Sequence, residues 1–184
     1  MLDIQQTELE GVLIVTPRRL SDSRGYFSET YNERVFRDAG LDVEFVQDNQ
    51  SLSVDAGTVR GLHFQAPPFA QSKLVRVIAG AILDVAVDAR KGAATYGRYV
   101  KAELSADNGA QLFIPQGFVH GFITLTPDTL VSYKVDNFYD QTSDGAVLWN
   151  DPDLAIDWGD HATKAVLSEK DASAQSWRKF QSPF

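Results

Sequence analysis

The stretch Gly57-Thr-Val-Arg-Gly-Leu-His-Phe-Gln65 carries the strongest fold signal in the chain. Its side chains alternate in character from one residue to the next, which is the period of a β-strand with two different faces. One predicted face carries Val59, Gly61, His63 and Gln65, and the other carries Arg60, Leu62 and Phe64. Strict alternation therefore separates Arg60 from His63. The two can serve one site only through a bulge or at the end of a barrel.

A second stretch, Gly109–His120, has the form Gly-x5-Pro-x-Gly-x2-His and carries another of the three histidines. Together with the glycine and histidine of Gly57–His63, it resembles the two signature motifs of the cupin jelly roll. That resemblance implies a barrel in which the remaining strands frame the space between these two. His120 shares its parity with Phe118 and Phe122, so a barrel of this kind would turn it inward.

Composition sets the class of protein. A chain of 184 residues with 43% hydrophobic and 23% charged residues is expected to form one domain, residues 1–184. Its net charge of −8 argues against binding to nucleic acid or to an anionic membrane. An anionic substrate would need a local cluster of arginine and lysine. The acidic, polar N-terminus does not resemble a signal peptide, and no apolar run approaches the roughly 20 residues of a membrane span, so we expect a cytoplasmic protein.

Many short strands with turn signals about every ten residues predict an all-β sandwich or barrel. With the two motifs, the expected fold is a cupin-type jelly-roll β-barrel with short peripheral helices. The helices are expected between Asn32 and Gly40 and after the capping-box sequence Ser168–Asp171. Ala79-Gly80-Ala81 predicts a hairpin. The expected strands span residues 11–15, 25–31, 43–51, 58–65, 73–78, 82–88, 97–104, 111–114, 118–125 and 129–139.

His63 has three interpretations: a packed histidine, a metal ligand or a general base. Metal-binding cupins usually present His-x-His and then a glutamate. Here Gln65 replaces the second histidine, and Pro68, Phe69 and Ala70 occupy the positions where the glutamate would fall. Two imidazoles and an amide make a poor site for Fe²⁺ or Zn²⁺, so we expect no metal. A general base becomes the leading chemical role. The third histidine, His161, lies in a polar stretch typical of a solvated loop.

Other candidates depend on strand parity. Lys73 opens a strand two residues before Val75. Burying an ammonium is costly, so a lysine that faces inward here is expected to have a function; a solvent-facing lysine is the alternative. Tyr133 and Tyr139 share one predicted strand, about 20 Å apart, with one buried and the other at the rim. Arg24 and Arg60 have the planar guanidinium groups that could clamp a diphosphate.

The order and spacing of several motifs resemble the dTDP-4-dehydrorhamnose 3,5-epimerase family over nearly the whole chain. None of the motifs is specific alone, but together they are. They are Asp22-Ser-Arg-Gly-Tyr-Phe-Ser-Glu29, Gln47-Asp-Asn-Gln-Ser51, Arg60–Gln65, Lys73-Leu-Val-Arg-Val77, Asp84-Val-Ala-Val-Asp88, Ile114–Gly121, Tyr133-Lys134, Asn137-Phe-Tyr139, Trp149-Asn-Asp-Pro152 and Ser168-Glu-Lys-Asp171.

The resemblance implies a role for each matching residue. His63 would be the base, oriented by Asp171. Tyr133 would donate a proton on the opposite face of the sugar, and Lys73 would stabilise the enolate. The implied substrate-binding residues are Arg24, Arg60, His120 and Lys170 for the diphosphate and sugar, Glu29, Gln47, Asp48 and Asn49 for the nucleotide, Tyr139 for stacking on thymine, and Phe27 and Asp144. Family members often have glutamate at the position of Asp144. The family is also homodimeric, with the N-terminal segment carrying Phe27 and Glu29 into the partner's site.

The chemistry of such a reaction fits these residue types. In a 4-keto sugar, C3 and C5 are both α to the carbonyl, so removing either proton gives an enolate that needs a nearby cation or donor. No redox cofactor is required, and no Gly-x-Gly-x-x-Gly motif is present. The rival functions are an epimerase acting at only C3 or C5, a metal-dependent cupin oxygenase or isomerase, and a non-catalytic cupin that binds sugars or nucleotides.

Overall fold

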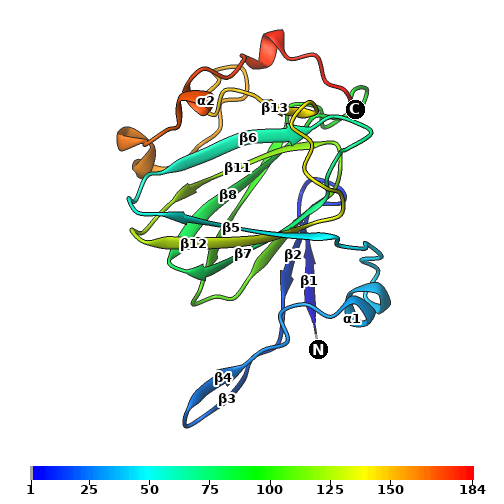
Figure 1. Cartoon of the computed structure of the whole chain (residues 1–184), viewed down its shortest axis with the longest axis vertical. Helices are drawn as coiled ribbons and strands as arrows, with labels where there is room; N and C mark the ends of the chain where they lie inside the picture. Colours follow the sequence, from blue (N-terminus) through cyan, green and yellow to red (C-terminus); the bar gives the residue numbers. More distant parts are fainter. Residues whose placement is uncertain (1) are drawn as a thin grey trace.

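A computed structural model describes residues 2–184, which form two large antiparallel sheets that face each other and a separate two-stranded hairpin (Figure 1). The six-stranded sheet has the order β1 (Asp3–Gln6), β2 (Leu13–Thr16), β10 (Gln111–Ile114), β7 (Lys73–Ala79), β12 (Thr129–Val135) and β5 (Gln47–Ser53). The five-stranded sheet has the order β13 (Asp144–Ala146), β6 (Val59–Gln65), β11 (Phe118–Thr124), β8 (Ala81–Asp88) and β9 (Tyr99–Ser105). The predicted all-β jelly-roll architecture is confirmed.

Helices are few and short. In the described part of the chain they comprise α1 (Glu33–Asp38), α2 (Glu169–Ala172) and two 3₁₀ turns, Asp160–Lys164 and Trp177–Lys179. Asn32 caps α1 as predicted, since its side chain accepts a hydrogen bond from the Val35 amide. Within residues 2–184, no helix is long and apolar enough to cross a membrane.

Three hydrophobic clusters are buried among residues 2–184, and the smallest, around Phe36 and Leu74, packs α1 against the six-stranded sheet. The inner core fills one part of the space between the sheets, with Val75, Phe118, Phe122 and Val131 among its buried members. A second core covers the outer face of the five-stranded sheet, where the chain from β13 to the C-terminus runs across β6 and β11 (Figure 1). This outer layer brings α2 against β6. Strand β6 therefore contacts the C-terminal segment on one side and the space between the sheets on the other.

The predicted hairpin at residues 79–81 is wrong. β7 belongs to the six-stranded sheet and β8 to the five-stranded sheet, so the turn carries the chain from one sheet to the other. Gly80 has φ +80°, and a Cβ there would lie 2.4 Å from the Thr129 hydroxyl oxygen. A tight glycine turn is equally suited to a hairpin and to a change of sheet. The local sequence therefore could not distinguish them.

The N-terminal region differs from the prediction in two ways. Strand β1 was not predicted, and the expected strand 25–31 is only the second half of a small hairpin, β3 (Leu20–Asp22) with β4 (Gly25–Phe27). This hairpin projects away from the two large sheets (Figure 1). Its aromatic residues Tyr26 and Phe27 are 58% and 69% exposed. Such exposure is unusual for large aromatic residues, and they add little to the chain's own core.

Candidate active site

A cavity of about 390 Å³ opens between the two sheets. An adjoining cavity of about 110 Å³ shares the residues His63, Lys73 and Tyr133 with it. The large cavity is further lined by residues from β5, β6, β11 and the segment around α2, namely Ser51, Thr58, Val59, Arg60, His120, Phe122, Val166, Leu167, Ser168, Lys170 and Asp171. The small cavity adds Gln47, Asn49, Phe64, Gln65, Gln71, Tyr139 and Asp144.

A bulge in β6 brings Arg60 and His63 to the same cavity. His63 pairs with His120 of β11, whereas Arg60 pairs with Phe122, so two residues of β6 between these pairs lie opposite the single residue Gly121. The extra residue reverses the parity between the two side chains. Gly121 makes this possible, because a Cβ on it would lie only 2.8 Å from the Arg60 carbonyl oxygen. Leu62 packs in the outer core as expected, but Arg60 faces inward, contrary to strict alternation.

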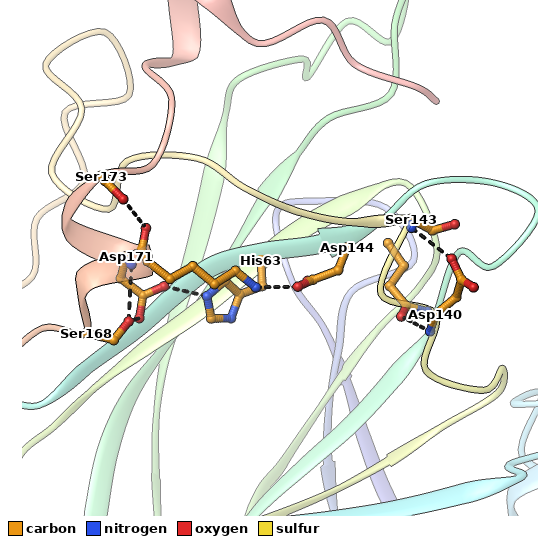
Figure 2. A network of polar contacts seen from close by, with 9 residues as sticks. His63, Asp140, Ser143, Asp144, Ser168, Asp171 and Ser173 are labelled. Carbon is orange, nitrogen blue, oxygen red and sulfur yellow. Dashed lines mark hydrogen bonds and ion pairs between the residues drawn. The ribbon is translucent and has the colours of Figure 1, made fainter.

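His63 forms a hydrogen-bonded pair with Asp171. Its Nε2 lies 2.5 Å from Asp171 Oδ1, and Ser168 donates its hydroxyl to Asp171 Oδ2 at 2.9 Å (Figure 2). Burial opposes ionisation of Asp171, but the contacts with His63, Ser168 and Lys170 hold its pKa below the ordinary value. The ionised carboxylate accepts the Nε2 proton of His63. The ring nitrogen Nδ1 then carries the lone pair that a general base requires.

The same residues that start α2 therefore serve the histidine. Ser168 caps the helix by accepting a hydrogen bond from the Asp171 amide at 3.1 Å, as the capping-box sequence predicts. This cap fixes the first turn of α2 against β6 and aims the Asp171 side chain at His63. The pairing spans 108 positions in the sequence.

A second histidine–aspartate pair lies deeper in the cavity. His120 Nε2 is 2.6 Å from Asp84 Oδ1, and both residues are buried. Burial lowers the pKa of His120, and the nearby cation Lys73 adds to that effect, although Asp84 partly opposes it. Asp84 Oδ2 has no hydrogen-bond partner among residues 2–184. A buried carboxylate oxygen without a partner is uncommon, and here it lies close to where Lys73 enters the cavity.

Lys73 lies at the start of β7 with its ammonium group in both cavities. Burial lowers its pKa from 10.5 to about 8, with partial compensation from the charges of Asp84 and Asp144. Within the described part of the chain, Lys73 forms no ion pair within 4.0 Å. The inward-facing interpretation is therefore correct, and the ammonium is desolvated without direct contact to a carboxylate.

Tyr133 approaches the cavity from the opposite sheet. It lies on β12, where its register partners are Asn49 of β5 and Val75 of β7, and it lines both cavities. His63 lies on β6 in the other sheet. Burial is the main reason that the pKa of Tyr133 is raised, so the phenol stays protonated at neutral pH. A basic imidazole and a protonated phenol thus enter one space from two facing sheets.

Tyr139 does not lie on the same strand as Tyr133, contrary to the prediction. β12 ends at Val135, and residues 136–140 fold back over the small cavity. The two tyrosines therefore line one cavity. The ring of Tyr139 is at its mouth, with the residue 59% exposed. Its amide donates a hydrogen bond to Gln47 Oε1 at 3.2 Å, and Gln47 in turn donates to Asn49.

Lys170 and Asp144 form an ion pair between α2 and β13, beside His63 (Figure 2). Lys170 lines the large cavity and Asp144 the small one. Both predicted binding residues therefore lie at the site, where they are available to a ligand that displaces or joins their pair.

Four predicted binding residues do not reach this site within the chain. Asp48 points to the outer face of the six-stranded sheet and pairs with Lys134 at 2.9 Å. This is the result of alternation, because its neighbours Gln47 and Asn49 face inward. Arg24, Phe27 and Glu29 belong to the projecting N-terminal segment, and the exposed Arg24 side chain forms an ion pair with Asp22.

Sequence reasoning missed three polar residues of the site: Asp84, Ser51 and Ser168. Asp84 had a detectable signal, since it is a carboxylate at an inward position in the middle of β8, a strand that is otherwise apolar up to its last residue, Asp88. The Ser51 hydroxyl lines the large cavity and has no hydrogen-bond partner among the described residues. Nothing in the local sequence of Ser51 distinguishes it from the other polar residues of β5.

We expect replacement of Arg60 to weaken the binding of dTDP. Arg60 lines the large cavity, and its guanidinium is held by hydrogen bonds to Ser53 Oγ and the Leu52 carbonyl of β5 in the facing sheet. A charge-assisted hydrogen bond contributes about 1.5–3 kcal/mol, so Arg60→Ala should reduce affinity by roughly 10- to 150-fold in calorimetry. Arg178→Ala, on the surface beside Asp153, is the matched control. Unchanged affinity in Arg60→Ala would remove this residue from the binding site.

Comparisons with known proteins agree with this site. The family model for dTDP-4-dehydrorhamnose 3,5-epimerase matches residues 6–179. A dTDP-4-dehydrorhamnose 3,5-epimerase from Sinorhizobium fredii is 54% identical over 172 residues, which cover 94% of this chain and 88% of the relative.

Two solved structures extend the comparison. The epimerase of the same name from Bacillus anthracis, with TDP and PPi bound, has a TM-score of 0.93 and 46% identity, covering 96% of this chain and 99% of that one. A dTDP-6-deoxy-D-glucose-3,5-epimerase from Legionella pneumophila, in complex with dTDP-4-keto-L-rhamnose, has a TM-score of 0.92 and 38% identity, covering 98% and 95%. The chain therefore belongs to the dTDP-4-dehydrorhamnose 3,5-epimerase family.

Proposed function

We propose that the protein inverts C3 and C5 of dTDP-4-dehydro-6-deoxy-D-glucose to give dTDP-4-dehydro-L-rhamnose. One observation carries the mechanism: His63, held by Asp171, and the protonated phenol of Tyr133 enter the same cavity from facing sheets. Removing a proton from one face of a sugar and returning one to the other face inverts the carbon. The two solved relatives, one with TDP and PPi bound and one in complex with dTDP-4-keto-L-rhamnose, support a nucleotide sugar as the ligand.

Each inversion can be written with these groups alone. His63 takes the proton from the carbon next to the carbonyl, and the C–H electron pair moves into an enolate with negative charge on O4. The ammonium of Lys73 stabilises that oxygen. Tyr133 then gives its proton to the opposite face of the carbon. Proton exchange with solvent restores neutral His63 and protonated Tyr133 before the second centre reacts.

The predicted binding residues form two groups, one in each cavity. Arg60, His120 and Lys170 line the large cavity and would hold the sugar and diphosphate. Gln47, Asn49 and Tyr139 line the small cavity, where the exposed tyrosine ring would stack on thymine. Asp144 joins the two groups through its ion pair with Lys170.

We further propose a homodimer in which the β3–β4 hairpin reaches the partner's site. The exposed apolar residues Leu20, Tyr26 and Phe27 on a hairpin that leaves its own barrel support this arrangement. It would deliver Arg24, Phe27 and Glu29, which do not contact the chain's own cavity, to the substrate of the partner. The cytoplasmic location stays a prediction.

Incubation with dTDP-4-dehydro-6-deoxy-D-glucose in D₂O tests the function. We expect deuterium at both C3 and C5 and a product whose proton NMR couplings report inversion at both centres. Inversion at one centre alone would identify a single-centre epimerase. Binding without exchange at either carbon would identify a non-catalytic binding protein and contradict the proposal.

We expect activity to survive metal removal. The described residues contain no group of three or more histidine, cysteine, aspartate or glutamate side chains placed to share a metal ion. His63 and His120 each direct one ring nitrogen to an aspartate, and the Gln65 amide is bonded to backbone groups. Prolonged dialysis against EDTA should leave the rate unchanged. A loss of activity that one added metal restores would show that the enzyme depends on a bound metal and would contradict this expectation.

A further inference from the structure

Gln65 has a buried amide whose hydrogen bonds all go to loop backbone. The residue lies at the end of β6, two positions after His63, and is 5% exposed. Its Nε2 donates to the Phe69 carbonyl at 2.7 Å and to the Phe138 carbonyl at 3.1 Å, while its Oε1 accepts from the Asp140 amide at 2.8 Å. Both amide protons and the carbonyl oxygen are therefore in use. One side chain of the rigid barrel thus ties together two loops that are about 70 residues apart.

These bonds enclose Tyr139 on both sides. Gln65 bonds the carbonyl of the residue before Tyr139 and the amide of the residue after it, and Gln47 accepts the amide of Tyr139 itself. Two glutamines on facing sheets thereby fix three consecutive backbone positions. The Tyr139 ring, by contrast, is largely exposed and lines the small cavity. A free ring on a fixed backbone is what a stacking platform needs, because binding then loses little conformational entropy.

We propose that Gln65 is a positioning residue for the nucleotide: it holds the 138–140 loop so that Tyr139 is presented to the base. This rests on the proposed function, in which Tyr139 stacks on thymine. The amide hydrogen bonds of Gln65 all go to loop backbone, so none is directed at the base or at the reacting carbons. Its loss should therefore weaken recognition of the nucleoside much more than the chemistry at His63.

Gln65→Met tests the proposal, because it keeps the length of the side chain and removes all three hydrogen bonds. In the free enzyme, amide hydrogen exchange of residues 137–143 should become at least roughly tenfold faster, while exchange in β6 and β11 stays near that of the unaltered protein. The dissociation constant for dTDP should rise by roughly tenfold or more, as for a lost base–aromatic stack, while that for pyrophosphate is unchanged. The rate at saturating substrate should change little.

A double variant separates positioning from general loosening. If Gln65 acts through Tyr139, then Gln65→Met should add little to the loss of dTDP affinity caused by Tyr139→Ala. Asp151→Asn is the control for a buried polar tether elsewhere, because Asp151 is 1% exposed and holds the Trp177 amide outside both cavities. That variant should leave dTDP affinity unchanged. Should Gln65→Met fail to fold, Gln65→Glu retains the acceptor for Asp140 and supports the same measurements.

Two outcomes would overturn the inference: unchanged exchange in residues 137–143, or equal losses of affinity for dTDP and pyrophosphate. Failure of the proposed function is a separate result, because it would show as absent dTDP binding in the unaltered protein. The hydrogen-exchange measurement uses no ligand, so it tests the tether in either case.

Discussion

Replacing His63 with asparagine is expected to abolish epimerisation and also the exchange of the C3 and C5 protons with D₂O. Asparagine can still accept or donate a hydrogen bond near Asp171, so the cavity should keep its shape. It has no lone pair basic enough to take a proton from carbon. Without proton abstraction no enolate forms, and neither inversion nor deuterium incorporation can occur. Proton NMR and mass spectrometry of the recovered sugar measure both quantities in one sample.

Tyr133→Phe is expected to reduce inversion much more than the exchange of the C3 and C5 protons with D₂O. His63 and Lys73 remain, so the enolate still forms, but the other face of the sugar lacks its proton donor. His63 would then return most protons to the face they left. Inversion should fall by about 10²–10⁴-fold, as for a lost general acid, while exchange persists to a greater extent.

The ratio of deuterium incorporation to inversion is the decisive number. Tyr96→Phe is the matched control, because Tyr96 packs on Trp177 outside both cavities and should retain an unchanged ratio. If Tyr133→Phe lost exchange as completely as His63→Asn, the phenol would be required to form the enolate. The assignment of the two side chains to opposite faces would then be wrong.

The placement of Arg60 shows how far the alternation of β6 could be trusted. Alternation correctly put Leu62, which packs in the outer core, on the face opposite His63 and Gln65, which line the small cavity. It failed at Arg60 because one extra residue in β6 is accommodated against Gly121 of another strand. A strand's own sequence does not reveal where its neighbour lacks a side chain. The sequence allowed either a bulge or the separation of Arg60 from His63 on opposite faces. Only the pairing of β6 with β11 decided between these alternatives.

The His63–Asp171 pair shows a similar limit for the site. The sequence around Ser168 correctly predicted a capped helix, and the family resemblance supplied the role of Asp171. No local pattern connects residue 171 with residue 63, because their contact depends on the C-terminal segment packing across β6. Asp84 is the opposite case: a charged residue at an inward strand position was visible and should have been counted as a site candidate.

In the proposed homodimer, the β3–β4 hairpin packs on a surface that a single chain does not contain. Local alternation identified extended backbone from Gly25, but the segment pairs only with β3 and leaves Phe27 exposed. Residues that act in a partner's site satisfy no packing rule of their own barrel. Resemblance to the family was therefore the only source for the roles predicted for Phe27 and Glu29, whereas the planar guanidinium of Arg24 also suggested a diphosphate clamp.

Lys73→Met is expected to stabilise the fold and to remove activity. The ammonium of Lys73 is held in the cavity at a free-energy cost, which its pKa of about 8, down from 10.5, reports. A shift of that size corresponds to a cost on the order of 3 kcal/mol. Methionine fills similar space without charge, so the free energy of unfolding at pH 7 should rise by up to about that amount. The enolate would lose its cation, and exchange and inversion should fall together by about 10²–10³-fold.

The sign of the pH dependence provides a second test of the same variant. Below pH 8 the lysine is protonated in both the folded and the unfolded chain, so the whole cost is present. Between pH 8 and pH 10.5 the folded protein releases the proton first, and the cost disappears as the pH rises. Lys73→Met should therefore be more stable than the unaltered protein at pH 7, with the difference shrinking toward pH 10 in urea titrations.

Activity should show the complementary dependence. The unaltered enzyme needs the ammonium, so its kcat/KM should decline as the pH rises through about 8. Lys91→Met, at an exposed position, is the control and should alter neither stability nor rate. If Lys73→Met were no more stable at pH 7, the ammonium would not be desolvated as the cavity suggests. If it were more stable and still active, another group would stabilise the enolate. A gain in stability with a loss of both exchange and inversion is the combination that a buried catalytic cation requires.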